Sequence, residues 1–503
     1  MLDLIKILKK HKSRLLLILI LSITFFNQVS LAFTTDTFLW DQVREAKIIR
    51  NFVYNRIIPP PMPTSIGGSL SADYYYLNSF FVKIFNISAT DIPEFLNNAQ
   101  IFINILLLLG IYIAISFFWE ERMGLTGVFL VATSPLYQIN FVAWNHFLVP
   151  FFCVLSLSCL NAFFSTGKYH WLLLVLLWIA FGVRLHPSAL FLLPTVFLSL
   201  SVLVYNKTIS LRQLAICIIL ITIASIIFIQ NSSFLGDLVV RSKPLGFQSV
   251  FSFLPLYIVA IFLALTSTVS SITFWSNHGQ GVFPVQIANL LLIIWLLKSC
   301  LKLTKSGKSP LLQMSFVLGG SLVTGILLAA TYGRSHTLYS HYLYPLAIIF
   351  IFFAVSVFSR VSRKLLFFVE VCLSIVLLFL FISNSSKMLG EIHEGSSFTK
   401  FKLVAAYISK HQEMWPIYIV RIAQFPELDS QTPFITSLGY DYYFESDHVP
   451  VVQKFSESKT LLYLCEIKNC LEKNLLKGIV PFKEEVHPVF VTQFHGVSVF
   501  RLE

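Results

Sequence analysis

The chain has 503 residues, of which 56% are hydrophobic and 15% aromatic, while only 12% are charged. Soluble globular proteins carry about a quarter charged residues, so the composition of the chain as a whole predicts a protein that crosses a membrane many times. The formal net charge of +12 is therefore not taken as a nucleic-acid-binding surface. Cytoplasmic loops of membrane proteins are rich in lysine and arginine, and that bias accounts for the excess.

An apolar run at residues 15–33 follows a basic amino terminus that ends at Arg14. Its length, about twenty residues, is enough to cross a bilayer. A cleaved signal peptide is the alternative, because Ser30, Leu31 and Ala32 form an acceptable cleavage site. We favour a retained helix because the run is long for a signal peptide. In both cases residues 34–98 emerge outside the cytoplasm.

Further apolar runs predict about eleven crossings in all, with the amino terminus inside and the carboxyl terminus outside. The segment 251–275 is long enough to cross, but a crossing there would place the Lys298–Lys308 cluster outside, against the positive-inside rule. We therefore expect 251–275 to lie on the outer surface or to re-enter it. The remaining predicted spans are 101–119, 124–141, 147–164, 171–183, 188–205, 214–229, 285–301, 312–332, 343–358 and 365–382.

From Asn384 onward the composition becomes that of a soluble domain. We expect a transmembrane domain at 1–383, which includes a first external loop at 34–98, and a small external α/β domain at 384–503. Cys465 and Cys470 could pair if this domain lies in an oxidising compartment. A helical pattern and runs of β-branched and aromatic residues predict a helix at 400–410 and strands at 415–422, 460–467, 488–494 and 496–502.

The first external loop is dense in charge between residues 35 and 76. From Leu39 onward its apolar positions approximate a helical stripe, which predicts a short amphipathic helix along the membrane interface. Such a helix would hold its carboxylates near the lipid headgroups. A solvated amphipathic linker without chemistry is the simpler interpretation. The charged residues of this loop include Asp36, Asp41, Arg44, Glu45, Lys47, Arg50 and Arg56.

This loop resembles the first external loop of the polyprenyl-phosphate-dependent membrane glycosyltransferases of the C-type fold, which include protein O-mannosyltransferases and aminoarabinose transferases. Its sequence is LWDQVREAKIIRNFVYNRIIPPPMPTSIGGSLSADYYYLNSF. Asp41 stands at the family's aspartate, whereas Gln42 replaces the common second acid. A glycine pair and a tyrosine run, 74–76, match the later part. Asp73 departs from the family, because Ala-Asp stands here where Gly-Pro often occurs.

Three further stretches agree with the resemblance: NFVAWNHFLVPFF, FGVRLHPSALFLLP and SHYLYPL. They occur in the family's order and on the predicted outer face, and the resemblance covers about residues 1–385. It implies an all-α polytopic membrane domain of the C-type fold. The matching residues are Trp144, Asn145 and Pro150 in the first stretch, Arg184, His186 and Pro187 in the second, and His341, Tyr342 and Pro345 in the third.

The reaction that the resemblance implies makes simple chemical demands. An inverting sugar transfer needs one base, which takes the proton of the acceptor hydroxyl as its oxygen attacks the anomeric carbon. A phosphate leaving group departs without a dedicated acid, so one carboxylate suffices. We expect Asp41 to be this base. Asp36 fits this role less well than Asp41, because the helix that follows Asp41 can fix the position of Asp41.

Cationic and hydrogen-bonding groups would hold the lipid phosphate and the sugar. Each has a simpler structural role as well: Arg184 could reach to the membrane interface, His341 could pack, and the tyrosines could form an interfacial aromatic belt. The predicted substrate-binding residues are Arg44, Tyr74, Tyr75, Asn145, Arg184, His186, Arg334, His341 and Tyr342.

A metal-dependent reaction, as in oligosaccharyl transferases, would need several carboxylates around a divalent ion. The stretch NFVAWNH offers no acid. We therefore expect a metal-independent enzyme that uses no cofactor. Glu45 and Asp73 are the residues that could overturn this expectation.

Two other functions fit the sequence less well than sugar transfer. A lipid or glycan transporter or flippase would carry ionisable residues at mid-membrane, whereas the predicted spans are nearly free of charge, with Glu370 the exception. A lipid-linked polymer ligase or polymerase would carry its main charged loop late in the membrane domain, whereas here that loop directly follows the first predicted span.

The favoured interpretation is a hexosyl or pentosyl transferase of the plasma (inner) membrane with its active site on the extracytoplasmic face. Its expected partners are a polyprenyl-phosphate-linked sugar, membrane lipid and an acceptor that is a protein, lipid or glycan, with no nucleic acid. The sequence leaves open the sugar, the acceptor, the carrier length and the oligomeric state.

Overall fold

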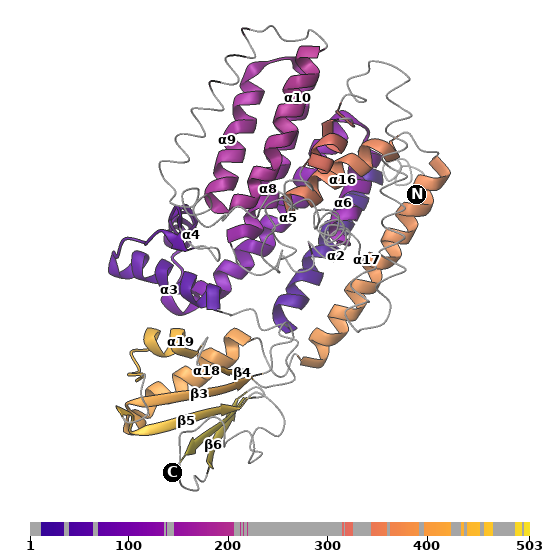
Figure 1. Ribbon diagram of the computed structural model, residues 1–503. Coiled ribbons are helices and arrows are strands. Elements are labelled where there is room, and N and C mark those ends of the chain that lie inside the picture. Colours follow the sequence, from indigo (N-terminus) through magenta and orange to yellow (C-terminus); the bar gives the residue numbers. More distant parts are fainter. Residues whose placement is uncertain are drawn as a thin grey trace, which may run out of the picture. The chain divides into compact units, whose positions relative to one another are not determined.

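A computed structural model gives the fold of the chain (Figure 1). It is mostly helical, with a small sheet near the carboxyl terminus. The residues it describes are 12–34, 40–63, 69–134, 137, 145–205, 212, 215, 219, 314–315, 317–324, 344–359, 363–391, 397–423, 434–436, 440–452, 457–465, 488–494 and 497–502.

Contacts divide the chain into two compact units, each formed by segments that are far apart in sequence. We call them the helical unit and the sheet unit. The helical unit consists of Met1–Gln28, Pro60–Tyr74 and Ala99–Ile382. The sheet unit consists of Val29–Pro59, Tyr75–Asn98 and Ser383–Glu503.

Long apolar helices dominate the described part of the chain. Because a bilayer cannot satisfy free backbone groups, helices that bond their own backbone are the natural way to cross it. Helices long and apolar enough to cross a membrane lie at Ser13–Thr34, Ala89–Phe118, Val149–Thr166 and Leu366–Ser386. Shorter apolar helices lie at His170–Leu185, Ser188–Val204 and Tyr344–Phe358.

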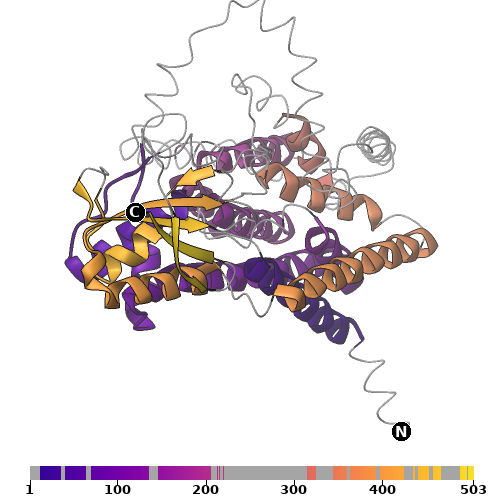
Figure 2. The ribbon, with the colours of Figure 1, turned by 90° about the horizontal axis from the view of Figure 1, so that it is seen from below.

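The helical elements follow the chain in this order (Figure 1). The long helix α17 can be followed in orange in both Figure 1 and Figure 2. The helices are α2 (Lys12–Thr34), α3 (Trp40–Asn55), α4 (Asp73–Ile84), α5 (Ile92–Phe118), α6 (Glu121–Ala132), α8 (Val149–Thr166), α9 (Tyr169–Leu185), α10 (Leu193–Tyr205), α16 (Tyr344–Phe358), α17 (Arg363–Glu391), α18 (Ser397–Lys410) and α19 (Tyr440–Ser446). Short 3-10 turns are η1 (Ala89–Asp91), η2 (Asn145–Leu148), η3 (Pro187–Leu192) and η6 (Gln412–Met414).

Most predicted spans coincide with these helices. Within the run predicted at 124–141, α6 ends at Ala132, Thr133 and Ser134 follow it outside the helix, and Tyr137 is again helical; the other residues of the run lie outside the described ones. The run at 312–332 is described at 314–315 and 317–324, which are helical. The segments 251–275 and 285–301, and all but two residues of 214–229, lie outside the described residues.

Two glycines of α6 lie close to α5. A Cβ atom added at Gly124 would lie 2.9 Å from the carbonyl oxygen of Tyr112, and one added at Gly127 would meet the side chains of Ile111 and Ile115. Small residues allow membrane helices to approach this closely. The two glycines therefore set the distance between α5 and α6.

We predict that Gly124→Ala lowers the free energy of unfolding by roughly 1–2 kcal/mol, because the added methyl group must move a backbone carbonyl. Thermal unfolding in detergent measures the effect. Gly110→Ala is the control, since the nearest atom to its added Cβ, Cγ1 of Val154, is 3.4 Å away. That variant should be neutral or slightly stabilising. Equal losses in both variants would contradict the packing account.

The sheet unit contains a five-stranded sheet with strand order β4-β3-β5-β7-β6. β3 and β5 run parallel, and the other neighbouring pairs run antiparallel. The predicted helix and four predicted strands are confirmed to within a few residues, while the short β4 was not predicted. The strands are β3 (Ile417–Ala423), β4 (Phe434–Thr436), β5 (Thr460–Cys465), β6 (Pro488–Phe494) and β7 (Val497–Leu502).

Helix α18 packs within the sheet unit through a helical stripe of buried residues and contacts α19 and β6. That stripe is Phe398, Phe401, Val404, Ala405 and Ile408, the spacing expected of an amphipathic helix. The pairing of Cys465 with Cys470 lies outside the described side chains.

Segment 34–98 and the carboxyl-terminal segment are joined by ion pairs inside the sheet unit. Arg50 of α3 donates to Oε2 of Glu445 at 2.9 Å and to Oγ of Ser446 at 2.8 Å. Lys402 of α18 lies 2.6 Å from Asp91 and 2.9 Å from Glu94. Burial lowers the pKa of Lys402, but its hydrogen bonds to the two carboxylates outweigh this, so the pKa is raised overall. The sequence had not predicted this association of loop and tail.

Candidate active site

Three of the stretches that the sequence singled out meet in the helical unit. η2 begins at Asn145 and contacts α8 and α9. η3 begins directly after His186 and contacts α9 and α16. The ring of Phe147 in η2 stacks on that of Tyr344, the first residue of α16, with centroids 5.7 Å apart. The segments around Asn145 and His186 and the start of α16 therefore lie at one end of the bundle.

Arg184 lies in the last turn of α9 and pairs with Asp73, the first residue of α4. Its Nη2 donates to Oδ1 of Asp73 at 2.8 Å, and its Nε contacts Oδ2 of the same group. Nε also lies 3.4 Å from Oγ of Ser71. Paired hydrogen bonds of this kind fix a guanidinium in one orientation. The side chains of Arg184 and Asp73 remain 36% and 33% exposed, so the pair is open to solvent or ligand.

The backbone before Asp73 explains how this carboxylate is placed. β1 (Met62–Pro63) and β2 (Ser69–Leu70) pair antiparallel and bring together the two ends of the intervening loop. Asp73 then begins α4, and an acidic group at a helix amino terminus is favoured by the helix dipole. The strand pair and the helix start together hold Asp73 beside α9.

His186 caps the turn that follows α9. Its Nδ1 accepts a hydrogen bond from the backbone N–H of Ser188 at 3.2 Å and lies 2.9 Å from Oγ of the same residue. A neutral imidazole that accepts at Nδ1 carries its proton on Nε2. His186 therefore has a defined tautomer, with Nε2 as the donor.

Asp41, the predicted base, is the second residue of α3. A helix amino terminus favours an ionised carboxylate. The side chain of Asp41 lies outside the part of the chain that the structure describes. One turn along α3, Glu45 is 1% exposed and lies 3.8 Å from Nη2 of Arg44. The catalytic role of Asp41 and the binding role of Arg44 stay predictions.

The tyrosine run divides between the interior and the surface. Tyr74 and Tyr75 are buried, whereas Tyr76 is exposed and makes an edge-to-face contact with Phe52 at 5.3 Å between centroids. Contact of Tyr74 and Tyr75 with a sugar stays a prediction. Arg334, His341 and Tyr342 lie outside the described residues, as does the side chain of Asn145.

Within the described ranges, no three His, Cys, Asp or Glu side chains come together as a metal site. Asp73, one of the two residues considered for a metal, is paired with Arg184, and the absence of a metal from the reaction stays a prediction. Sequence reasoning had missed this partnership. The one sequence signal for the pairing was that Asp73 departs from the family pattern.

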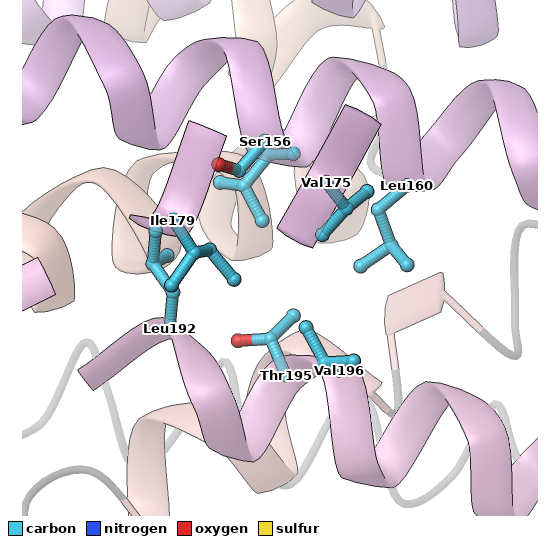
Figure 3. A pocket seen from close by; sticks show the side chains of 8 residues that line it. Ser156, Leu160, Val175, Ile179, Leu192, Thr195 and Val196 are labelled. Atoms are coloured by element: carbon cyan, nitrogen blue, oxygen red, sulfur yellow. The ribbon is translucent and has the colours of Figure 1, made fainter. Parts of the chain in front are cut away.

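A cavity between α8, α9 and α10 does not serve as a substrate site. In Figure 3 the labelled side chains point toward one another across it. The lining is almost wholly apolar, and the space leaves no room for a water molecule, so a sugar cannot enter. The lining residues are Ser156, Leu157, Leu160, Val175, Ile179, Leu192, Thr195 and Val196.

Comparison with known proteins bears on the fold. No family model matches the chain, and no curated protein matches it. Among solved structures, ArnT from Cupriavidus metallidurans bound to undecaprenyl phosphate is similar over 98% of both chains, with a TM-score of 0.50 and 11% identity. The apo form of that ArnT matches over 97% of both chains, with a TM-score of 0.51 and 11% identity.

The chain has the C-type glycosyltransferase fold. The fold that the four stretches predicted is thus confirmed, and at 11% identity the likeness concerns the fold alone. An oligosaccharyltransferase of Archaeoglobus fulgidus, solved with zinc and sulfate, covers 86% of this chain and 62% of its own at 14% identity. Its TM-score of 0.45 is too low to carry an argument.

Proposed function

We propose that the protein is an inverting glycosyltransferase that moves a sugar from a polyprenyl phosphate to an acceptor hydroxyl at the outer face of the membrane. The observation that carries the proposal is the oriented cation Arg184, held by Asp73 beside His186 at the end of the bundle where η2 and α16 meet. The C-type fold, shared with an ArnT solved with undecaprenyl phosphate, supports the class of donor.

In the proposed reaction, Asp41 takes the proton of the acceptor hydroxyl while that oxygen attacks the anomeric carbon. The bond between the anomeric carbon and the phosphate oxygen breaks, and the polyprenyl phosphate leaves with the electron pair. Because the attack comes from the face opposite the leaving group, the configuration of the sugar is inverted. One carboxylate is sufficient for this sequence, so the proposed reaction uses no metal.

Arg184 and His186 would hold the departing phosphate. The Asp73 carboxylate contacts Nε and Nη2 of Arg184, which leaves Nη1 outside the pair. A guanidinium fixed on one edge can present its other edge to an anion with little loss of entropy. His186 adds a donor at Nε2.

The transporter alternative is weakened by the surroundings of Glu370, the acid inside a predicted span. Arg122 of α6 donates to this carboxylate from Nε at 3.0 Å and from Nη2 at 2.8 Å, and Oγ1 of Thr126 lies 3.1 Å away. A carboxylate held by two hydrogen-bonded neighbours joins α17 to α6. We infer a structural role for it, whereas a transporter would use such a group along a substrate path.

Proteoliposomes that contain lipid-linked sugars extracted from the source membrane separate the two functions. We expect the protein to consume the donor and release free polyprenyl phosphate, only when an acceptor is present. Movement of the intact lipid-linked sugar across the bilayer, without release of polyprenyl phosphate, would support a flippase and remove the transferase proposal.

A further inference from the structure

Helix α4 turns an apolar face outward. Its exposed apolar side chains recur one turn apart, at 76–77, 80–81 and 84, whereas Tyr74, Tyr75 and Val82 on its other side are buried. A helix that is apolar on both sides normally has apolar surroundings on both, either protein or lipid. The protein covers one side of α4 and leaves the other open.

The end of α3 extends this open face. The hydroxyl of Tyr54 donates to the carbonyl oxygen of Ile87, just beyond α4, and the rings of Phe52 and Tyr76 contact each other across the two helices. So many large apolar side chains exceed the single ones that any surface carries, and such a surface marks an interaction site. We call it the apolar patch; its members, each 38–75% exposed, are Tyr54, Ile57, Ile58, Tyr76, Leu77, Phe80, Phe81, Ile84 and Phe85.

The patch adjoins a helix that can cross the membrane. α4 ends at Ile84 and the apolar helix begins at Ala89, so the connecting residues can extend over at most about 18 Å. The ring of Phe85 contacts that of Phe95 in α5, with centroids 5.8 Å apart. Phe102 lies two turns further along α5, on the same face as Phe95, and is 61% exposed. The patch therefore leads onto a face of α5 that a bilayer would cover.

Two exposed cations lie among the residues of the patch. Arg56 stands between Tyr54 and Ile57 in the chain, and the ammonium group of Lys83 lies 5.1 Å from the ring centroid of Phe52. Residues 54–58 and 74–90 contain no aspartate or glutamate. Apolar side chains bordered by cations match the boundary between acyl chains and anionic headgroups. Together with the adjoining span, this charge favours lipid over a protein partner.

We propose that the apolar patch inserts into the interfacial region of the membrane, where Arg56 and Lys83 bind the phosphates of anionic phospholipids. Because the open face runs along the whole of α4, this helix lies parallel to the membrane surface. The apolar stripe predicted for α3 does not supply this surface, since Val43 and Ile49 of that stripe are buried. The inference does not depend on the proposed sugar transfer.

The photoreactive residue p-benzoylphenylalanine in place of Phe80 tests the insertion. The full chain is placed in nanodiscs of equal parts phosphatidylcholine and phosphatidylglycerol, and mass spectrometry measures the lipid attached after irradiation. Phe490 of β6 is the matched control position, because it is exposed to a similar extent, 56% against 59%, and lies outside the patch. We expect several-fold more attached lipid at position 80 than at position 490.

Equal attachment at the two positions, or none at position 80, would overturn the insertion. Attachment of position 80 to another protein in native membranes, in place of lipid, would do the same. Phe85, which is 61% exposed, provides a second position if the first variant does not fold.

The double variant Arg56→Gln with Lys83→Gln tests the role of the cations. We expect position 80 to prefer phosphatidylglycerol over phosphatidylcholine by several-fold, and the double variant to lose this preference while total attachment stays nearly constant. Lys168→Gln removes an exposed cation of another segment and should keep the preference. An unchanged preference in the double variant, or an equal loss in Lys168→Gln, would contradict phosphate binding by the patch.

Discussion

Asp41→Asn is expected to reduce sugar transfer by about 10²–10⁴-fold, the contribution of a positioned general base. The substitution keeps the size and the hydrogen-bonding capacity of the side chain but removes its ability to accept the proton of the acceptor hydroxyl. Donor binding should change little, since in the proposed site cations hold the lipid phosphate. The loss should therefore appear in kcat and not in KM for the donor.

Asp36→Asn is the matched control for this prediction. It removes a carboxylate from the same loop, five positions earlier in the chain, and should leave transfer within about twofold of the unmodified protein. Membrane insertion and thermal unfolding of both variants establish that they are folded. Full activity of Asp41→Asn would remove the proposed base, and equal losses in both variants would show that the loop needs its charge in general.

Arg184→Ala is expected to lower kcat/KM by about 10²-fold, because charge-assisted hydrogen bonds to the leaving phosphate are lost. Asp73→Asn keeps an oxygen acceptor for Arg184 but removes the charge, so we expect a smaller loss, about tenfold, mainly in KM for the donor. Steady-state kinetics with a lipid-linked sugar distinguish the two variants.

Lys168→Ala controls for a general loss of positive charge, because Lys168 is an exposed cation at the opposite end of α9. Its kinetics should match those of the unmodified protein. If Asp73→Asn bound the donor more tightly, Asp73 would be a competitor of the phosphate and not the group that orients Arg184. If Lys168→Ala were inactive, the kinetic losses of the other variants would reflect damage to the fold and not the loss of contacts to the phosphate.

Local patterns explain why many elements were predictable. α18 repeats its apolar residues with helical spacing, and β6 and β7 are short runs of β-branched and aromatic residues. β4 has only three residues, too few to show a pattern. α6 ends at Ala132 although the apolar run continues, so hydropathy alone did not mark where the helix stops.

Contacts between distant segments were not predictable in the same way. Arg184 and Asp73 are 111 positions apart, and Arg50 and Glu445 are 395 apart. Nothing in the sequence around one residue of such a pair indicates its partner.

Only part of the candidate site could be predicted from the sequence, and the reason is physical. Cations at the ends of apolar helices stand out in a sequence, and so Arg184 and His186 could be named. Asp73 was considered for a metal, because a carboxylate alone does not show whether its partner is an ion or an arginine. The structure provides that partner.

A single-turnover experiment tests the central claim most directly. Reconstituted protein receives a labelled lipid-linked sugar and an acceptor on the outer face, and the release of polyprenyl phosphate is followed for the unmodified protein and for Asp41→Asn. The account predicts one polyprenyl phosphate released for each sugar transferred by the unmodified protein, and almost none by the variant in the same time. Equal release by both proteins would contradict it.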